Sequence, residues 1–303
     1  MEPKGKTALI TGGVSGIGFG IARAFSNAGV DLVLTYRNED YRAQAESWFK
    51  QRTRPQPRYV TLDVTDRERW SEIADEVGPV HILVNNAGVS VFGPTDEASY
   101  ADYDWIMGVN FGGVVNGLVT FVPRIKALGQ GGHIVNVASM AAYLSGPQAG
   151  IYTASKFAVR GLTECLRMNL APYGIGVSLM CPGLTRTNAW DSALRRPESF
   201  ADSGFAPPDP AALKHFGTAF EAGMDPLEVG EKTLAGIREN RALILTHPEF
   251  AADFREIYET SIAALPDEKA PAGRLEIERL RRAALRAAVE GKVISIDDLT
   301  SGE

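Results

Sequence analysis

The stretch TALITGGVSGIGFGIARAF, residues 7–25, decides the fold of this 303-residue chain. It consists of an apolar run, a turn that contains Gly12, Gly16 and Gly18, and a helix-length segment. Glycines let backbone N–H groups approach a phosphate closely, and the following helix adds the positive end of its dipole. A glycine pattern alone could serve only to pack a helix on a strand. Its position between the first strand and the first helix favours dinucleotide binding.

Short apolar runs alternate with longer amphipathic segments through most of the chain. We expect strands at residues 7–11, 31–36, 59–64, 81–85, 133–138, 176–181 and 241–246. Between them lie helix-length segments at residues 17–28, 40–52, 66–77, 101–128 and 150–173. This alternation predicts an α/β, doubly wound Rossmann fold, in which a seven-stranded, mostly parallel sheet carries helices on both faces.

Two regions depart from the alternation. Residues 184–212 are rich in Pro, Ser and Asp, and a loop of this length in a compact domain is usually functional. We therefore predict a dinucleotide-binding and catalytic domain at 1–247, with a substrate loop or lid at 184–225. Residues 248–303 form a predicted helical extension packed on that domain.

One segment of the extension, residues 274–292, has two stripes. The apolar stripe consists of Ile277, Leu280, Ala284 and Ala287, and the basic one of Arg279, Arg282 and Arg286. Interleaved acidic residues favour an amphipathic helix docked on the domain over a helix that binds nucleic acid or a membrane surface.

Composition excludes several classes of protein. A net charge of −6 and a pI of about 5.4 argue against nucleic acid as a partner. Since neither a signal peptide nor an apolar run of 18 residues is found, we expect a cytoplasmic protein without a membrane partner. Cys165 and Cys181 are expected to be reduced packing residues. The four histidines share no metal-ligand spacing, so no metal is predicted.

With Thr11 ahead of it, the glycine turn TGGVSGIG resembles the signature of short-chain dehydrogenase/reductases. The resemblance extends in order and spacing over about 180 residues: NNAG at 85–88, Asn110, Ser139, YTASK at 152–156 and PGLTRT at 182–187. Asp63 and Val64, expected at the end of the third strand, match the family's adenine contact. The family interconverts ketones and secondary alcohols with a nicotinamide cofactor.

The resemblance implies a catalytic group of Asn110, Ser139, Tyr152 and Lys156. Ser139 would hold the substrate oxygen, and Tyr152 would give or take its proton. A free phenol has a pKa of about 10, and a nearby ammonium lowers it. Lys156, four residues after Tyr152, lies on the same helix face and would also bind the nicotinamide ribose. Asn110 would hold a water that links Lys156 to solvent.

Other positions are assigned through the same resemblance. The cofactor-binding residues are predicted to be Gly12, Ser15, Gly16, Ile17, Gly18, Tyr36, Arg37, Asn38, Asp63, Val64, Asn86, Ala87, Gly88, Tyr152, Lys156, Pro182, Gly183, Thr185 and Thr187. The substrate residues are predicted to be Ser139, Met140, Tyr152, Gly183 and Trp190.

The stretch LVLTYRNED, residues 32–40, bears on the choice of cofactor. The end of the second strand faces the adenosine ribose, where an acidic residue favours NAD and an arginine favours the 2′-phosphate of NADP. Here Tyr36 takes the acidic position and Arg37 follows it. We therefore expect a preference for NADP(H), with NAD(H) as the alternative. Glu39 and Asp40 lie close enough to soften it, and Ser15 stands where some NADP users have a basic residue.

A narrower resemblance concerns residues 100–125, 173–178 and the tail, which are similar to aryl-ether Cα-dehydrogenases. Those enzymes oxidise a benzylic alcohol with NAD, and this chain departs from them at Tyr36 and Arg37. We expect a bulky or aromatic substrate and a homodimer formed by the helices at 101–128 and 150–173. The alternatives are an NAD-dependent benzylic alcohol dehydrogenase, an epimerase or dehydratase, and a regulator that binds NADP without catalysis.

Overall fold

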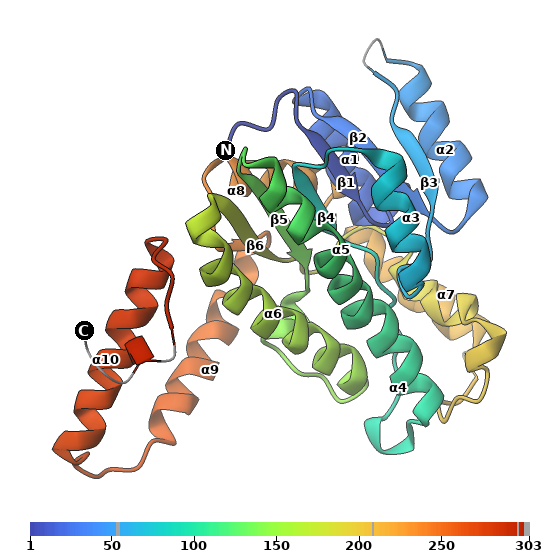
Figure 1. Ribbon diagram of the computed structural model, residues 1–303. Coiled ribbons are helices and arrows are strands. Elements are labelled where there is room, and N and C mark those ends of the chain that lie inside the picture. Colours follow the sequence, from blue (N-terminus) through green and yellow to red (C-terminus); the bar gives the residue numbers. More distant parts are fainter. Residues whose placement is uncertain (53–54, 208, 296, 300–303) are drawn as a thin grey trace.

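The structure, a computed structural model, describes residues 1–303 except 53–54, 208, 296 and 300–303. Seven parallel strands form one sheet in the order β3-β2-β1-β4-β5-β6-β7 (Figure 1). The strands are β1 Thr7–Ile10, β2 Asp31–Tyr36, β3 Arg58–Thr61, β4 Ile82–Asn85, β5 Gly132–Val137, β6 Ile175–Cys181 and β7 Leu243–Leu245. This confirms the predicted Rossmann sheet. The strand order reverses between β1 and β4, which is where such sheets bind their ligands.

Two strands, β7 and β3, depart most from their predicted ranges. β7 covers three of the six residues expected at 241–246. β3 ends at Thr61, so Asp63 and Val64 follow this strand and do not end it. The reason is local, since the Asp63 carboxylate accepts hydrogen bonds from the backbone N–H and hydroxyl of Thr65 and turns the chain toward the next helix.

Helices cover both faces of the sheet (Figure 1). One buried cluster joins the sheet to α1 Gly16–Asn27, α2 Glu39–Lys50 and α8 Pro226–Arg238. The cluster on the other face involves α3 Arg67–Val77, α4 Tyr100–Met107, α5 Gly113–Leu128 and α6 Gly150–Leu170. Apolar side chains are buried on both faces of the parallel strands, as the near-continuous apolar runs predicted.

The helix expected at 101–128 is interrupted. Between α4 and α5, Gly108–Gly112 forms a π-helical turn, a feature that is frequent at functional sites. Asn110 lies in this turn and is buried. The whole stretch Tyr100–Leu128 is long and apolar enough to cross a membrane, but half of its most apolar window is buried within the fold. It serves here as a core element that packs against β4, α3 and α6.

The region that follows β6 is more helical than the sequence indicated. Residues 184–225, which we call the lid, contain short 3₁₀ turns at Ala189–Arg195 and Glu198–Phe200 and the helix α7 Pro210–Ala219. Asp209 begins α7, and its carboxylate accepts hydrogen bonds from the backbone N–H groups of Ala211 and Ala212. α7 begins at residue 210, near the end of the segment 184–212 that was expected to form a loop.

The tail forms α9 Ala251–Ala263 and α10 Ala272–Val289 beyond α6 (Figure 1). Leu280, Ala284 and Ala288 of α10 are buried. The predicted apolar stripe is thus shifted, and Ile277 is 50% exposed. Cys165 of α6 is exposed, which corrects its expected packing role, whereas Cys181 is buried.

Candidate active site

The glycine turn has the backbone that phosphate binding requires. Gly12 and Gly16 have φ values of 61° and 50°, which lie in the left-handed region that glycine tolerates best. A Cβ on Gly18 would lie 2.2 Å from the carbonyl oxygen of Gly12, so only glycine allows α1 to approach the turn this closely. Ser15 begins α1 without capping it through its side chain. The first N–H groups of α1 therefore lack a side-chain cap, and a phosphate group fits this donor set.

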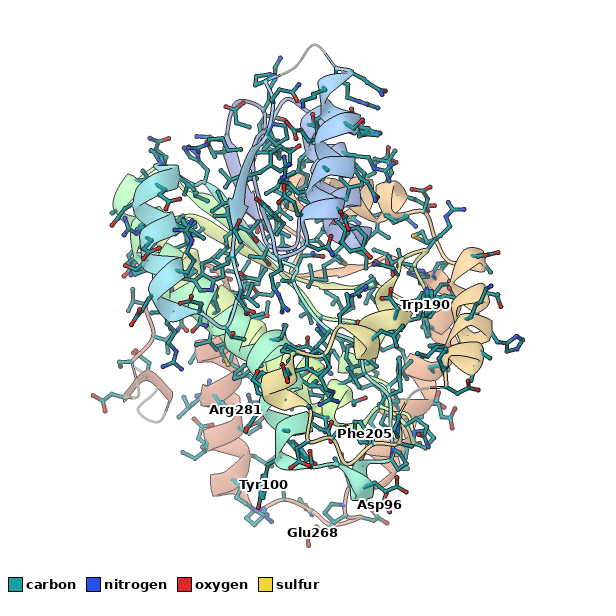
Figure 2. All side chains as sticks on the ribbon, turned by 90° about the vertical axis from the view of Figure 1, so that its right-hand side faces the viewer. Asp96, Tyr100, Trp190, Phe205, Glu268 and Arg281 are labelled. Carbon is teal, nitrogen blue, oxygen red and sulfur yellow. The ribbon has the colours of Figure 1, made fainter. Side chains whose placement is uncertain are left out.

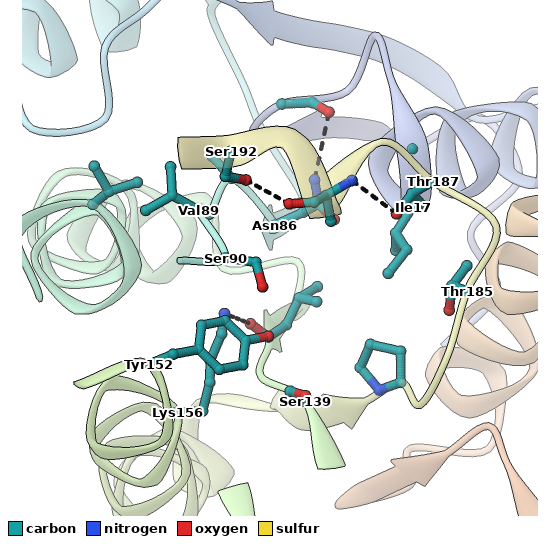
Figure 3. Close-up of a pocket in the computed structure, with 18 of the residues that line it drawn as sticks. Ile17, Asn86, Val89, Ser90, Ser139, Tyr152, Lys156, Thr185, Thr187 and Ser192 are labelled. Carbon is teal, nitrogen blue, oxygen red and sulfur yellow. Dashed lines mark hydrogen bonds between the residues drawn. The ribbon is translucent and has the colours of Figure 1, made fainter. Parts of the chain in front are cut away.

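A cavity of about 820 Å³ extends from this turn along the carboxyl ends of the strands. Most of the predicted cofactor residues line it: Gly12, Ser15, Gly16, Ile17, Tyr36, Arg37, Asn38, Val64, Asn86, Ala87, Gly88, Tyr152, Lys156, Pro182, Gly183, Thr185 and Thr187. Figure 3 shows Tyr152, Lys156 and Ser139 at one end of this pocket and Ile17 and Thr187 at the other. Residues up to 175 positions apart in the sequence are thus brought to one continuous cavity of a size that suits a dinucleotide.

Two predicted cofactor residues lie outside that lining. Gly18 packs beneath the turn against Gly12 and Asn86. Asp63 lies beside the cavity, where one of its carboxylate oxygens is 3.3 Å from the guanidinium of Arg37. Both side chains of this ion pair are about half exposed, so the pair leaves Arg37 accessible from the cavity.

Ser139, Tyr152 and Lys156 come together through two elements. Ser139 follows β5, and Tyr152 and Lys156 project from the first turns of α6. The ammonium nitrogen of Lys156 lies 5.5 Å from the centre of the Tyr152 ring and donates a hydrogen bond of 3.3 Å to the carbonyl of Val137. The close i, i+4 placement agrees with the sequence-based expectation for one helix face.

Burial dominates the ionisation of this group. It raises the pKa of the Tyr152 phenol, and the Ser139 hydroxyl, which favours the ionised form, does not reverse the shift. Burial also lowers the pKa of the Lys156 ammonium to about 8. The pKa of Tyr152 is shifted in the direction opposite to the one expected from a nearby ammonium. Burial disfavours the phenolate more strongly than the nearby charge favours it. A buried phenol with a raised pKa carries its proton at neutral pH.

Asn110 does not line the cavity but supports the residues that do. Its side-chain oxygen accepts a hydrogen bond of 2.8 Å from the N–H of Val89, and its amide donates to the carbonyl of Val89. The amide also donates to the Ser155 hydroxyl at 3.1 Å, and Ser155 donates to the carbonyl of Tyr152 at 2.6 Å. The π-helical turn therefore connects the segment after β4 to the start of α6.

The end of the cavity near Tyr152 is aromatic. The centre of the Phe92 ring lies 6.4 Å from that of Tyr152 and 5.6 Å from that of Phe216. The ring centres of Phe216 and Phe220 are 5.5 Å apart. Phe92, Phe220 and the predicted substrate residue Met140 all line the cavity. Isolated Phe residues in loops carry no periodic signal, so the sequence did not single out Phe92 or Phe220.

Trp190, also predicted to contact substrate, lies elsewhere. It packs against α7, where a Cβ on Gly217 would meet its ring at 2.7 Å (Figure 2). The aromatic side chain therefore anchors the lid to its own helix.

No cluster of three or more His, Cys, Asp or Glu suited to a metal ion occurs among the residues that the structure describes. His133 is buried, with its Nε2 2.8 Å from the Ser178 hydroxyl. His247 accepts a hydrogen bond of 3.0 Å from the N–H of Gly183 and thereby supports the cavity wall. Both histidines have structural partners.

Comparison with known proteins agrees with this geometry. The chain matches the short chain dehydrogenase family over residues 6–197. It is 36% identical over 274 residues to a C alpha-dehydrogenase from a Sphingobium species, covering 88% of this chain and 87% of the relative. A short chain dehydrogenase/reductase from Burkholderia phymatum, solved in complex with NAD, superposes with a TM-score of 0.80 at 34% identity and covers 89% of this chain and 99% of that one. A putative short-chain dehydrogenase from Novosphingobium aromaticivorans gives a TM-score of 0.79 at 37% identity, with 94% and 98% coverage.

Proposed function

Because this chain belongs to the short-chain dehydrogenase/reductase family, we propose that it is an NADP(H)-dependent enzyme that interconverts a bulky, aromatic ketone and its secondary alcohol. Action on alcohol or ketone groups with NAD(P) follows from membership of the family. The proposal adds the preferred cofactor, the residues that move the proton and the class of substrate. The single observation that supports the preference for NADP(H) is the position of Arg37, a cation that lines the cavity at the end of β2.

The surroundings of Arg37 support NADP over NAD. Tyr36 stands where a carboxylate would accept hydrogen bonds from the ribose 2′-hydroxyl and repel a 2′-phosphate. The nearby Glu39 forms an exposed ion pair with Arg42 at 2.5 Å, which offsets part of its charge. Asp63, 3.3 Å from Arg37, is half exposed and contributes only a weak, solvent-screened attraction. Arg37 is therefore available for a phosphate.

The proton transfer is assigned to Tyr152. When bound, the nicotinamide ring supplies or accepts the hydride at the substrate carbon. Ser139 is placed to hold the substrate oxygen, and Tyr152 donates its phenolic proton to that oxygen during ketone reduction. A raised pKa keeps Tyr152 protonated at neutral pH, as a proton donor requires. Lys156, whose pKa burial lowers to about 8, is placed to bind the ribose and to stabilise the phenolate left after transfer.

The aromatic rings around Tyr152 support the proposed substrate class. Phe92, which is 40% exposed, lies beside the proton donor, and Phe220 lines the same cavity. Both rings offer faces and edges to an incoming group. Aromatic pairs gain about 0.5–1.5 kcal/mol beyond the burial of their area. An aryl ketone would thus bind more tightly than an aliphatic ketone of equal length.

The alternatives keep the same fold. An NAD-dependent benzylic alcohol dehydrogenase is the nearest one, since the Sphingobium relative is called a C alpha-dehydrogenase. An epimerase or dehydratase would show no net change in nicotinamide absorbance. A regulator that binds NADP without catalysis would need no Tyr152 and Lys156 pair, which this chain keeps in place.

Further parts of the proposal concern the whole molecule. We infer a cytoplasmic homodimer in which α4, α5 and α6 form the interface, with residues 184–225 acting as the substrate lid. The division into a catalytic domain at 1–247 and an extension at 248–303 is part of the same proposal. The packing of the extension on the domain is supported by the contact of α10 with α6 and by the burial of Leu280, Ala284 and Ala288.

The test is a panel of aryl and aliphatic ketones and alcohols assayed with NADPH and NADH. We expect kcat/KM to be higher with NADPH, and Arg37→Gln to lower the NADPH value about tenfold, since a hydrogen bond to a charged group contributes about 1.5–3 kcal/mol and this one is partly exposed. Arg241→Gln, which removes an exposed arginine paired with Glu239, is the control and should leave the ratio unchanged. A wild-type preference for NADH would overturn the proposed cofactor.

A further inference from the structure

Two consecutive arginines of the lid contact different parts of the molecule. Arg196 contacts α4, where its guanidinium donates a hydrogen bond of 2.5 Å to the buried carboxylate of Asp102. It also donates to the carbonyl of Phe200 at 3.1 Å and lies over the ring of Trp105. These contacts fix the backbone of the lid at this point and hold the preceding residue in place.

Arg195 contacts the cofactor end of the cavity. One nitrogen of its guanidinium lies 3.4 Å from the Tyr41 hydroxyl, and another donates to the carbonyl of Asn188 at 3.3 Å. The amide of Asn188 donates to the same Tyr41 hydroxyl. Arg195, Asn188 and Tyr41 line the cavity together with Arg37, so a lid residue and the end of β2 face one space.

Arg195 remains accessible from the cavity although it is paired with a carboxylate. Asp191, on the same 3₁₀ turn, forms an ion pair with Arg195 and orients it. The Arg195 side chain is 39% exposed, so the guanidinium is only partly covered. A phosphate monoester carries about 1.5–2 negative charges at neutral pH, more than Arg37 alone can balance. The glycine turn has Ser15 in place of a basic residue, and it therefore adds no side-chain cation.

From this arrangement we propose that Arg195 is the second cation of the site for the adenosine 2′-phosphate, and that the lid delivers it. The inference rests on the proposed use of NADP(H). Tyr41 lies in the first turn of α2, four residues after Arg37. The fold places the end of β2, where Arg37 lies, against the adenosine ribose, which favours the 2′-phosphate over the pyrophosphate held at the glycine turn. Lid closure and recognition of NADP are then one event.

The test compares two cofactor fragments, adenosine 2′,5′-bisphosphate and adenosine 5′-monophosphate, by calorimetry. We expect the wild-type chain to bind the bisphosphate more tightly. Arg195→Gln should weaken the bisphosphate about tenfold and leave the monophosphate unchanged, since a charge-assisted hydrogen bond is lost for one ligand alone. Arg195→Lys should restore part of the affinity. Lys214→Gln removes the same charge from an exposed position of α7 and should change neither.

The outcomes separate this inference from the proposed function. Equal weakening of both fragments in Arg195→Gln would assign Arg195 to the 5′-phosphate or to lid packing and would overturn the inference. Full retention of the bisphosphate preference would overturn it too, while the NADP preference would stand on Arg37. A wild-type chain that binds both fragments equally would contradict the NADP preference itself.

Discussion

The ion pair between Asp102 and Arg196 gives a sharp test of how the lid is held. Asp102 is fully buried, and the Arg196 side chain is 12% exposed. Besides Arg196, the carboxylate accepts hydrogen bonds from the Ser203 hydroxyl at 2.7 Å and from the N–H groups of Ser99 and Gly204, each at 2.9 Å. One side chain of α4 thus binds the lid at three residues.

The size of the expected loss of stability follows from the ionisation of Asp102 and the charge of Arg196. Burial acts to raise the pKa of Asp102, but the hydrogen bonds from Ser99, Ser203, Gly204 and Arg196 outweigh it and lower the pKa to about 2 from an ordinary 3.8. A difference of this size stabilises the folded state by about 2 kcal/mol at neutral pH, and this contribution is lost as the pH falls through about 2. Asp102→Ala would also strand the Arg196 charge in a buried site, for which about 3–5 kcal/mol is typical.

The assay is a double-mutant cycle of Asp102→Ala and Arg196→Ala, followed by urea unfolding and the fluorescence of the tryptophans. We expect a coupling energy of at least about 1 kcal/mol, because each single change leaves the other partner unpaired in a buried site. The control is the cycle of Glu276→Ala and Arg279→Ala, an exposed pair at 2.6 Å on α10. Such a pair contributes about 0–1 kcal/mol. A coupling energy no larger than that of the control pair would refute the claim that the buried ion pair of Asp102 and Arg196 holds the lid.

Three further predictions concern the phosphate turn, acid stability and the substrate end. Gly18→Ala should cost about 1–3 kcal/mol of stability and abolish tight NADPH binding, because its Cβ would lie 2.2 Å from a carbonyl oxygen, whereas Gly273→Ala, with open space around it, should do neither. Burial lowers the pKa of His133 to about 3. As the pH falls, His133 is therefore protonated in the unfolded state before it is protonated in the folded state. The free energy of unfolding should fall by about 1.4 kcal/mol per pH unit between about pH 6.5 and 3. His133→Asn should flatten this slope in urea titrations, whereas the exposed His215→Asn should not. Phe92→Ala should raise KM for an aryl ketone several-fold and leave that for an aliphatic ketone unchanged, and equal effects on both would count against an aromatic substrate site.

Local patterns accounted for the fold and for the catalytic helix. The alternation of apolar and amphipathic runs predicted the positions of the strands and a mostly parallel sheet, because each buried parallel strand must be apolar on both faces. The spacing of Tyr152 and Lys156 alone predicted that both lie on one side of α6. The glycine positions also predicted the tight turn, and the structure shows why one of them must be glycine, since only a residue without Cβ fits at Gly18.

The features that the sequence did not reveal depend on contacts between distant segments. Arg195 and Tyr41 are 154 residues apart, and no local period relates them. Trp190 is an aromatic residue of a type that often contacts substrates, but its side chain packs against α7 and not in the cavity. The rise in the pKa of Tyr152 likewise comes from tertiary burial, which the pair spacing with Lys156 does not encode.

The central claim, that Tyr152 moves the proton in a ketone and alcohol interconversion, is tested most directly by Tyr152→Phe. NADPH affinity and turnover of an aryl ketone should be measured on the same preparation. The account predicts that the variant binds NADPH within about twofold of the wild type, since the ring and its packing remain, while kcat falls by at least about 10² because general acid catalysis is lost. Retention of wild-type turnover by Tyr152→Phe would contradict it.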